Sequence, residues 1–385
     1  MTSETAIGPG DVLERDTALT AEPDPARGRV AAARQSIDTH IAFPARHTTE
    51  LKEKAMSRTR GVIGLAAAIL FAAACSSGTT SSSSSPSAAA GSNLHFYFVT
   101  HGDNGTFWTV VQNGQKQAAT DLGVSVNYQG SNNDDTQECQ FISAAVTAKP
   151  DGLVVSPHSQ TVLDCAKQAA AGGIPLILIN NCGTTSSGQS YIAYSGALTC
   201  VGQPESAAGQ QAGVRLKADG GKHLLCVIHE ATSTSLRDRC AGAKAGFGGT
   251  ETDLVLDNAK SNVSSATATL QAKLSADKSI DSILALDPDV AKNIVESAVT
   301  GAGATAKIAT FDISTGVITD IQSGKIDFAV DQQQYLQGYL PIVFLKLFKQ
   351  NANTVGGFDT VKSGPGIVDK TNAATVASLA GKGTR

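Results

Sequence analysis

Three carboxylates in the second half of the chain each follow a predicted strand. Asp287 follows SILAL, Asp312 follows KIATF and Asp331 follows DFAV. In open parallel sheets, ligands bind outside the carboxyl ends of the strands, so these side chains are candidates for a cleft. Carboxylates in a cleft could hydrolyse a glycoside by acid/base chemistry. Asp312 and Asp331 could equally cap the helices that follow them.

The sequence lacks the motifs of the common enzyme classes that these carboxylates might serve. It has no G-x-S-x-G nucleophile elbow and no G-x-x-x-x-G-K-[ST] phosphate loop. GAGATA at 301–306 fits the dinucleotide fingerprint, but it follows a helical pattern and precedes a strand, the reverse of what phosphate binding requires. We therefore expect a protein that is not an enzyme and uses no cofactor.

The cysteines suggest disulfides in an oxidising compartment. Of the seven cysteines, Cys75 belongs to the N-terminal region, and the other six include no C-x-x-C pair followed by H-x-x-x-H. This spacing argues against a zinc site, and we expect no bound metal. An even number of cysteines outside the cytosol favours disulfides, with buried free thiols as the alternative. The candidates are Cys139, Cys165, Cys182, Cys200, Cys226 and Cys240.

Residues 56–75 have the features of a secretory signal. Arg58 and Arg60 provide the positive start, an uncharged and largely apolar run occupies 61–74, and three alanines precede Cys75. The segment resembles a bacterial lipobox, which implies a lipid anchor on Cys75 and a place in the cell envelope outside the cytoplasm. The alternative is a buried helix that ends in cysteine.

The segments on either side of this signal lack the apolar periodicity of folded protein. Residues 1–55 precede a signal that should be N-terminal, so we interpret them as a non-native upstream extension and Met56 as the start. The Ser- and Gly-rich stretch 76–93 reads as a flexible tether. An ordered body that begins near Leu94 leaves roughly 290 residues, enough for two domains.

The composition fits a soluble globular body. It is 41% hydrophobic and 17% charged, with a formal net charge of −4. The mild acidity and the absence of helical patterns in residues 1–55 argue against nucleic acid as a partner.

Short apolar runs alternate with helical patterns throughout the body. This alternation predicts an α/β fold of two doubly wound parallel-sheet lobes, because strands buried on both faces are continuously apolar. The predicted strands are LHFYFVT, VSVNYQ, GLVVS, PLILIN and YIAY in the first half, and HLLCVI, DLVLD, SILALD, KIATFD and DFAV in the second.

The element order suggests a disulfide pairing, which we state as a hypothesis. In a sheet of order 2-1-3-4-5, the helices after the second and third strands share a face, so Cys139 could reach Cys165. Two further pairs lie close in sequence: Cys182 with Cys200 around the fifth strand, and Cys226 with Cys240 between a strand and the next helix.

Taken together, several motifs in order resemble the type I periplasmic sugar-binding proteins of ABC transporters, the ribose- and galactose-binding group. The resemblance covers Leu94 to about Thr375. It implies two lobes joined by a three-crossing hinge, and a monomer that hands a simple sugar or polyol to the permease subunits of an ABC importer. The motifs are HGDNGTFWTVVQNGQKQAATDLG, PLILINN, TSTSLRDRCAGAKAGF, LALDPD, IATFD and DFAVDQQQYLQGYL.

The resemblance also implies ligand-binding residues, of types that suit the apolar faces and paired hydroxyls of a sugar. Without it, Phe107 and Trp108 would be interpreted as core and Arg237 as part of a solvated ion pair with Asp238. We interpret His101 and His158 as polar loop residues that do not bind ligand. The implied residues are Asp103, Asn104, Phe107, Trp108, Asn180, Asn181, Arg237, Asp287, Asp312, Asp331 and Gln332.

Three positions depart from the ribose-type pattern. Gly105 stands where that pattern has Asn, Asn180-Asn181 replaces Asp-Arg, and Asp287-Pro288-Asp289 replaces Asn-Asp-Glu. The loss of one Arg and the gain of an Asp argue against ribose itself. The motif VDQQQYLQGYL resembles a subset of the family that binds other simple sugars or polyols. A sensor that presents its sugar to a receptor or kinase is the alternative role.

The resemblance places the three lobe crossings near 195–200, 331–333 and 364–368. The first lobe would then comprise residues 94–195 and 333–365. The second lobe would comprise 196–332 and 366–385.

Overall fold

The computed structural model describes residues 93–102 and 105–385, which belong to one compact unit, Ser81–Arg385. The predictions for the upstream extension, the signal with Cys75, the tether, Asp103 and Asn104 fall outside the described residues. Within the described part, no helix has the length and apolar composition needed to cross a membrane.

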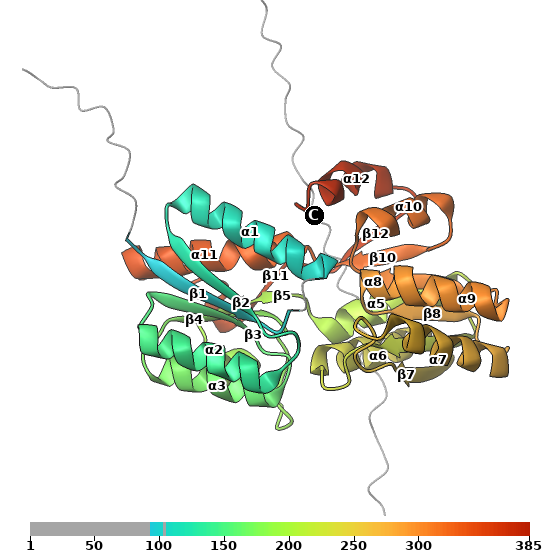
Figure 1. The fold of residues 1–385 in the computed structure, drawn as a ribbon, viewed down its shortest axis with the longest axis horizontal. Coiled ribbons are helices and arrows are strands. Elements are labelled where there is room, and N and C mark those ends of the chain that lie inside the picture. Colours follow the sequence, from blue (N-terminus) through green and yellow to red (C-terminus); the bar gives the residue numbers. More distant parts are fainter. Residues whose placement is uncertain (1–92, 103–104) are drawn as a thin grey trace, which may run out of the picture. The chain divides into compact units, whose positions relative to one another are not determined.

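The first sheet has the strand order β2-β1-β3-β4-β5-β11, with all pairs parallel. It therefore follows the predicted 2-1-3-4-5 order and adds a sixth strand from much later in the chain (Figure 1). Its strands are β1 (His95–Thr100), β2 (Ser125–Gly130), β3 (Gly152–Ser156), β4 (Leu176–Asn180), β5 (Thr199–Gly202) and β11 (Thr360–Lys362).

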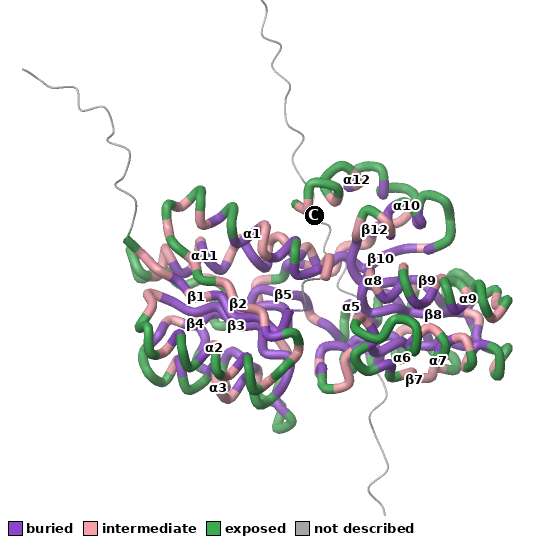
Figure 2. The backbone as a smooth tube through the Cα atoms, viewed as in Figure 1, coloured by how far each residue is buried: buried purple, intermediate pink, exposed green. Residues whose placement is uncertain are grey.

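Helices cover both faces of the first sheet, as expected for strands that are apolar on both sides. One face packs on α1 (Thr106–Leu122) and α11 (Gln334–Asn351), and the other on α2 (Asp135–Ala148) and α3 (Gln160–Ala171). The tube in Figure 2 shows the central strands β3, β4 and β5 buried and the outer sides of these helices exposed. A 3-10 turn at Gly356–Phe358 leads into β11.

The second sheet repeats the plan with the order β7-β6-β8-β9-β10-β12, in which only β12 is antiparallel to its neighbour. Its strands are β6 (His223–Ile228), β7 (Thr250–Val255), β8 (Ser282–Ala285), β9 (Lys307–Phe311), β10 (Phe328–Asp331) and β12 (Gly366–Asp369).

The second sheet is also covered on both faces. One face packs on α5 (Glu205–Ala218) and α6 (Thr234–Phe247). The other packs on α7 (Val263–Ala276), α10 (Thr315–Ser323), α12 (Ala373–Gly381) and the helical run of α8 (Pro288–Val290), a π-turn at Ala291–Val295 and α9 (Glu296–Ala302). Two α/β lobes built on doubly wound sheets confirm the predicted fold class.

Two details of the first lobe differ from the prediction. YIAY is not a strand: it forms α4 (Tyr191–Ser195), because Ser190 accepts a hydrogen bond from the Ala193 amide and Gly196 ends the helix in the left-handed conformation. The fifth strand is β5, which pairs with β4 in the first sheet. The first crossing therefore follows Gly202 and does not fall at 195–200.

The chain passes between the two sheets again between Asp331 and α11 and between Lys362 and Gly366. The three connecting segments contact each other. Ser363 donates its amide hydrogen to the Gly202 carbonyl (2.8 Å), and the Gln333 side chain donates to the Ser363 carbonyl (2.6 Å). These bonds gather the connections into one hinge.

The sulfur atoms of all six body cysteines lie at disulfide distance in the three pairs that the element order suggested. Cys139–Cys165 joins α2 to α3, Cys182–Cys200 joins the loop after β4 to β5, and Cys226–Cys240 joins β6 to α6. The Cα atoms of the three pairs are 5.7, 5.7 and 5.8 Å apart. Each bridge lies within one lobe.

Candidate functional site

A cleft between the two lobes is lined by polar side chains from the carboxyl ends of the strands and by two aromatic rings. Its cavity volume is about 40 Å³, room for a few water molecules only. A sugar ring would therefore enter when the lobes move apart. The lining residues are His101, Phe107, Trp108, Asn180, His229, Glu230, Ser233, Ser235, Leu236, Arg239, Lys260, Asp287, Asp312 and Gln332.

Phe107 and Trp108 lie in the first turn of α1 and form the aromatic wall of the cleft. The Trp108 ring makes edge contacts with the rings of Phe107 and His101, at centroid distances of 4.9 and 4.7 Å. Gly102 allows this packing, because a Cβ atom there would lie 2.7 Å from the Trp108 ring. Trp108 is only 3% exposed, so the ring is both part of the core and part of the cleft wall.

A buried ionic cluster supports this wall from behind. The His101 ring lies 4.6 Å from the His158 ring, and the two nitrogens of His158 lie 2.9 Å from Asp135 and 3.3 Å from Glu138. Burial alone would lower the pKa of His158, but the two carboxylates outweigh burial and raise it. The wall thus rests on an imidazole that lies between two carboxylates inside the first lobe.

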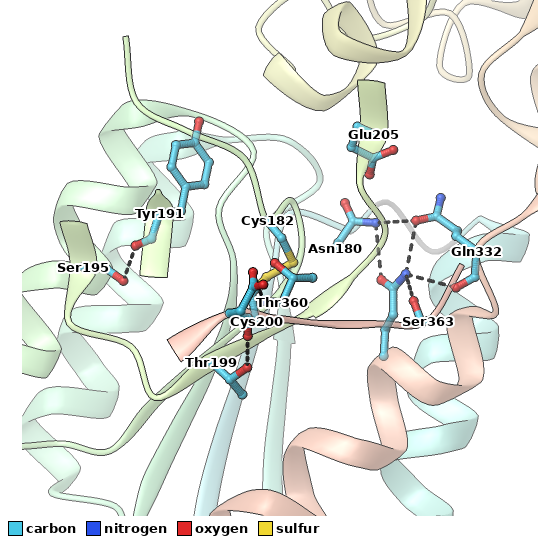
Figure 3. Close-up of a disulfide and its surroundings, with 12 residues drawn as sticks. Asn180, Cys182, Tyr191, Ser195, Thr199, Cys200, Glu205, Gln332, Thr360 and Ser363 are labelled. Atoms are coloured by element: carbon cyan, nitrogen blue, oxygen red, sulfur yellow. Dashed lines mark hydrogen bonds between the residues drawn. A yellow bond between two sulfur atoms is a disulfide. The ribbon is translucent and has the colours of Figure 1, made fainter. Parts of the chain in front are cut away.

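Asn180 ends β4 and connects the cleft to the hinge. Its side-chain amide points to the oxygens of Gln332 (3.3 Å) and Gln337 (3.4 Å), and the Gln337 amide in turn donates to the Ser363 hydroxyl (3.3 Å). Figure 3 shows this chain of amides beside the Cys182–Cys200 disulfide. Asn180 has a positive φ of 64°, a conformation that asparagine tolerates better than most residues.

Asp312 and Gln332 face each other at the ends of β9 and β10. The Gln332 side chain donates to Asp312 Oδ2 at 2.8 Å. Burial raises the pKa of Asp312 to about 8. At neutral pH this carboxyl is therefore largely protonated, so it can donate a hydrogen bond to a ligand oxygen as well as accept one.

Asp287 is the centre of a second polar group in the cleft. One of its oxygens accepts the amide hydrogens of Asp289 (2.8 Å) and Val290 (3.1 Å), and the other accepts from Lys260 (3.0 Å). Burial alone would raise the pKa of Asp287, but Lys260 and the nearby His229 bring it below the usual value. Burial lowers the pKa of His229.

Arg239 provides the guanidinium of the cleft, where the family resemblance had pointed to Arg237. Its Nε and one terminal nitrogen donate to Glu205 at 2.7 and 3.0 Å, and its charge lies over the Phe311 ring. Arg237 is exposed and donates to the Ala231 carbonyl. Two residues along a helix point to nearly opposite sides, and Arg239 shares the buried side of Leu236, Cys240 and Ala243.

Two other predicted residues lie beside the cleft and do not line it. Asn181 is fully buried and donates to the Thr234 hydroxyl of the other lobe (2.8 Å). Asp331 is also fully buried, and its carboxylate accepts from the Gln333 amide (2.8 Å) and from Arg385 (2.7 Å). Both oxygens of Asp331 are thus occupied by structural hydrogen bonds. The Asn181 amide nitrogen is occupied in the same way, whereas its buried Oδ1 has no hydrogen-bond partner among the described residues.

The remaining lining residues were missed or set aside by sequence reasoning. His229 and Glu230 follow β6 directly, so the strand-end rule that selected Asp287 could have found them. His101 follows β1 in the same way and was interpreted as a loop group. Ser233 is the N-cap of α6 and Ser235 lies in its first turn. Lys260 lies in a loop, where the sequence carries no periodic signal.

Most charges in the cleft are paired within the protein. Arg239 is paired with Glu205, Lys260 with Asp287, and Asp312 is largely neutral. Glu230 accepts from Asn133 of the first lobe (3.2 Å) and lies 3.6 Å from the His229 ring. This arrangement suits an uncharged ligand with several hydroxyl groups.

Comparison with known proteins agrees with this geometry. The family described as periplasmic binding protein domain matches residues 96–351. A carbohydrate transporter from Acidothermus cellulolyticus 11B, solved in complex with myo-inositol, is 38% identical with a TM-score of 0.70. That match covers 76% of this chain and 100% of the other.

Two further similar proteins bind sugars according to their names. The xylose/arabinose-binding protein XylF of Sulfolobus acidocaldarius is 26% identical over 264 residues, and the match spans 65% of the length of each protein. GanP, a glucose-galactose binding protein from Geobacillus stearothermophilus, is 18% identical with a TM-score of 0.63, which shows the fold alone. That match covers 73% of this chain and 98% of GanP. The matched family profile and the shared two-lobe fold show that this chain belongs to the periplasmic binding protein domain family.

Proposed function

We propose that this protein is an extracytoplasmic solute-binding protein that holds a neutral sugar or polyol between its lobes and delivers it to an ABC importer. The observation that carries the proposal is the cleft itself, in which aromatic rings of one lobe oppose carboxyl, amide and guanidinium groups of the other. Rings suit the apolar faces of a sugar, and paired polar groups suit its adjacent hydroxyls.

A cyclic polyol of the inositol type is the first ligand to test. The 38% identical protein was solved with myo-inositol, and the paired charges of the present cleft favour an uncharged ring. Thermal unfolding would be followed with myo-inositol, D-xylose, L-arabinose, D-galactose and, as a charged control, D-glucuronate. A ligand at about 100 times its dissociation constant adds about 2.7 kcal/mol to the free energy of unfolding. A raised midpoint with neutral compounds only is expected, and a response to glucuronate alone would contradict the proposal.

The lipid anchor is the second part of the proposal. The residues before Cys75 support it, since small residues precede a cysteine after a basic and apolar segment. A Cys75→Ser variant should move from the membrane fraction to the soluble fraction of cells. Retention of the variant in the membrane fraction would contradict the anchor without affecting the binding proposal. We also propose a monomer, which light scattering coupled to size exclusion would test.

A further inference from the structure

Asp289 reaches from the second lobe to the first residue of α1 in the first lobe. The Thr106 amide donates to Asp289 Oδ2 at 3.0 Å, and the Thr106 hydroxyl donates to the other oxygen of the same carboxylate. Asp289 belongs to α8 and is held in place by its neighbour Asp287, which accepts its amide hydrogen. One carboxylate thus binds two groups across the cleft.

This contact supplies the side-chain cap that α1 does not receive from its own N-cap residue. The first amides of a helix have no partner within the helix, and a side-chain oxygen just before the helix usually accepts one of them. Asp134, Ser159 and Ser314 do so for α2, α3 and α10. At α1 the N-cap is Gly105, which has no side chain, and the acceptor comes from the opposite lobe.

The capped turn carries the aromatic wall of the cleft. Phe107 and Trp108 directly follow Thr106, so the position of this turn sets the position of both rings. Asp289 is not among the cleft-lining residues. It can therefore affect a ligand through α1 without touching it.

We propose that Asp289 is a positioning residue that caps α1 when the lobes come together and thereby fixes the Trp108 ring against the ligand. The inference rests on the proposed function, because the ligand is what draws the lobes together. The carboxylate also favours closure electrostatically, since the N-terminus of a helix attracts negative charge. Removing it shifts the lobes toward separation and weakens binding.

The test compares Asp289→Ala and Asp289→Asn with a matched control, Asp281→Ala. Asp281 also accepts backbone amides, those of Lys222 (2.9 Å) and His223 (3.1 Å), but it lies at the opposite end of the sheet and within one lobe. The full-length protein would be titrated with myo-inositol by calorimetry. Hydrogen exchange of a peptide that begins upstream of residue 105 and ends at 118, and so retains the Thr106 amide, would be followed by mass spectrometry with and without the same compound.

Asp289→Ala should weaken the affinity about tenfold, the factor that corresponds to 1.4 kcal/mol. Asp289→Asn keeps one oxygen acceptor, so its loss of affinity should be smaller. In the wild type, myo-inositol should slow exchange in the first turn of α1, and Asp289→Ala should abolish that effect. Asp281→Ala should lower the unfolding midpoint equally with and without ligand and leave the affinity unchanged. In a double-mutant cycle, Thr106→Val should cause no further loss of affinity in a protein that already carries Asp289→Ala.

Unchanged affinity and unchanged exchange in Asp289→Ala would overturn the proposal. If the wild-type protein does not bind myo-inositol, that result counts against this ligand and not against the cap. The cap is then tested by comparing hydrogen exchange in the ligand-free wild type and the ligand-free Asp289→Ala variant. Faster exchange of residues 106–110 in Asp289→Ala than in the wild type would support the cap, and equal exchange would overturn it.

Discussion

At the scale of single residues, Trp108 serves both the core and the cleft. Its side chain is 3% exposed and contacts two other rings, so truncation affects folding as well as binding. Trp108→Ala should lower the free energy of unfolding by about 3–5 kcal/mol and weaken ligand binding. Trp108→Phe keeps an aromatic face and should retain most of the stability, so it separates the two effects. Wild-type affinity in Trp108→Ala, measured where the variant is folded, would contradict a role in the cleft wall.

Asp312 should make stability depend on pH. The folded protein keeps the Asp312 proton up to about pH 8, whereas the unfolded chain releases it near pH 4. The unfolded state therefore binds fewer protons between these values, and the free energy of unfolding falls as the pH rises, by up to about 1.4 kcal/mol per pH unit. Asp312→Asn lacks this titration, so its stability relative to the wild type should increase from pH 5 to pH 8.

Urea denaturation of the two ligand-free proteins at both pH values would measure this difference. The sign is fixed by the direction of the shift, because an acid whose pKa is raised in the folded state loses stability on the alkaline side. The same difference in stability at pH 5 and pH 8 would show that Asp312 is ionised in the folded protein.

At the scale of secondary-structure elements, α5 and α6 approach so closely that their backbones touch. A Cβ atom on Gly209 would lie 2.0 Å from the Arg239 carbonyl oxygen, and one on Gly242 would lie 2.0 Å from that of Ser206. Gly209→Ala must push α6 away and should cost about 3 kcal/mol of stability. Because Arg239 lines the cleft, the variant should also bind ligand more weakly.

Gly381→Ala in α12 is the matched control for this prediction. It is also a helical glycine, but nothing lies within 4 Å of the position that its Cβ would take. Alanine is the better helix former, so this variant should be as stable as the wild type or more stable by up to about 1 kcal/mol. Equal stability of Gly209→Ala and Gly381→Ala in urea would contradict the close approach.

The Cys182–Cys200 bridge connects elements that form the cleft. It spans 18 residues, and a loop of this length contributes about 3 kcal/mol by restricting the unfolded chain. Cys182→Ser/Cys200→Ser should lose about this much stability and also weaken binding, because the bridge follows Asn180 and Asn181. Cys139→Ser/Cys165→Ser, which releases the bridge between α2 and α3, should lose similar stability and keep its affinity. An identical affinity loss in both variants would argue against a local effect.

Sequence periodicity was sufficient to predict most helices and strands, but not the short ones. Long apolar strands such as β3 and β6 stand out because both faces are buried. YIAY was misjudged because its capping residues outweigh its strand-like composition. The strand β11 has three residues, too few for any period to appear in the sequence.

The residues of the candidate site were also only partly predictable from the sequence. Asn180, Asp287 and Asp312 could be selected because parallel strands bring their carboxyl ends to one edge. The apolar positions of α6 define its buried side, and Arg239 lies on that side whereas Arg237 does not. The family motif alone does not distinguish the two arginines. Lys260 could not have been found, since its position depends on a loop that folds back over Asp287.

At the scale of the whole molecule, the two lobes meet at polar contacts that surround the cleft. Asn133 donates to Glu230, Asn181 to Thr234, and Thr106 to Asp289, each pair joining the first lobe to the second. These contacts lie outside the apolar cores of both lobes. Water can replace these hydrogen bonds when the lobes separate, and a ligand that bridges the lobes shifts the balance toward closure.

The central claim is that a neutral polyol or sugar binds in this cleft and holds the lobes together. The most direct measurement is calorimetric titration of the protein, first stripped of any copurified solute by unfolding and refolding, with myo-inositol and the neutral sugars named above. Small-angle scattering would be recorded before and after saturation. We predict binding of one molecule per chain and a smaller radius of gyration in the bound form. Refolded protein that binds none of these compounds would contradict the account.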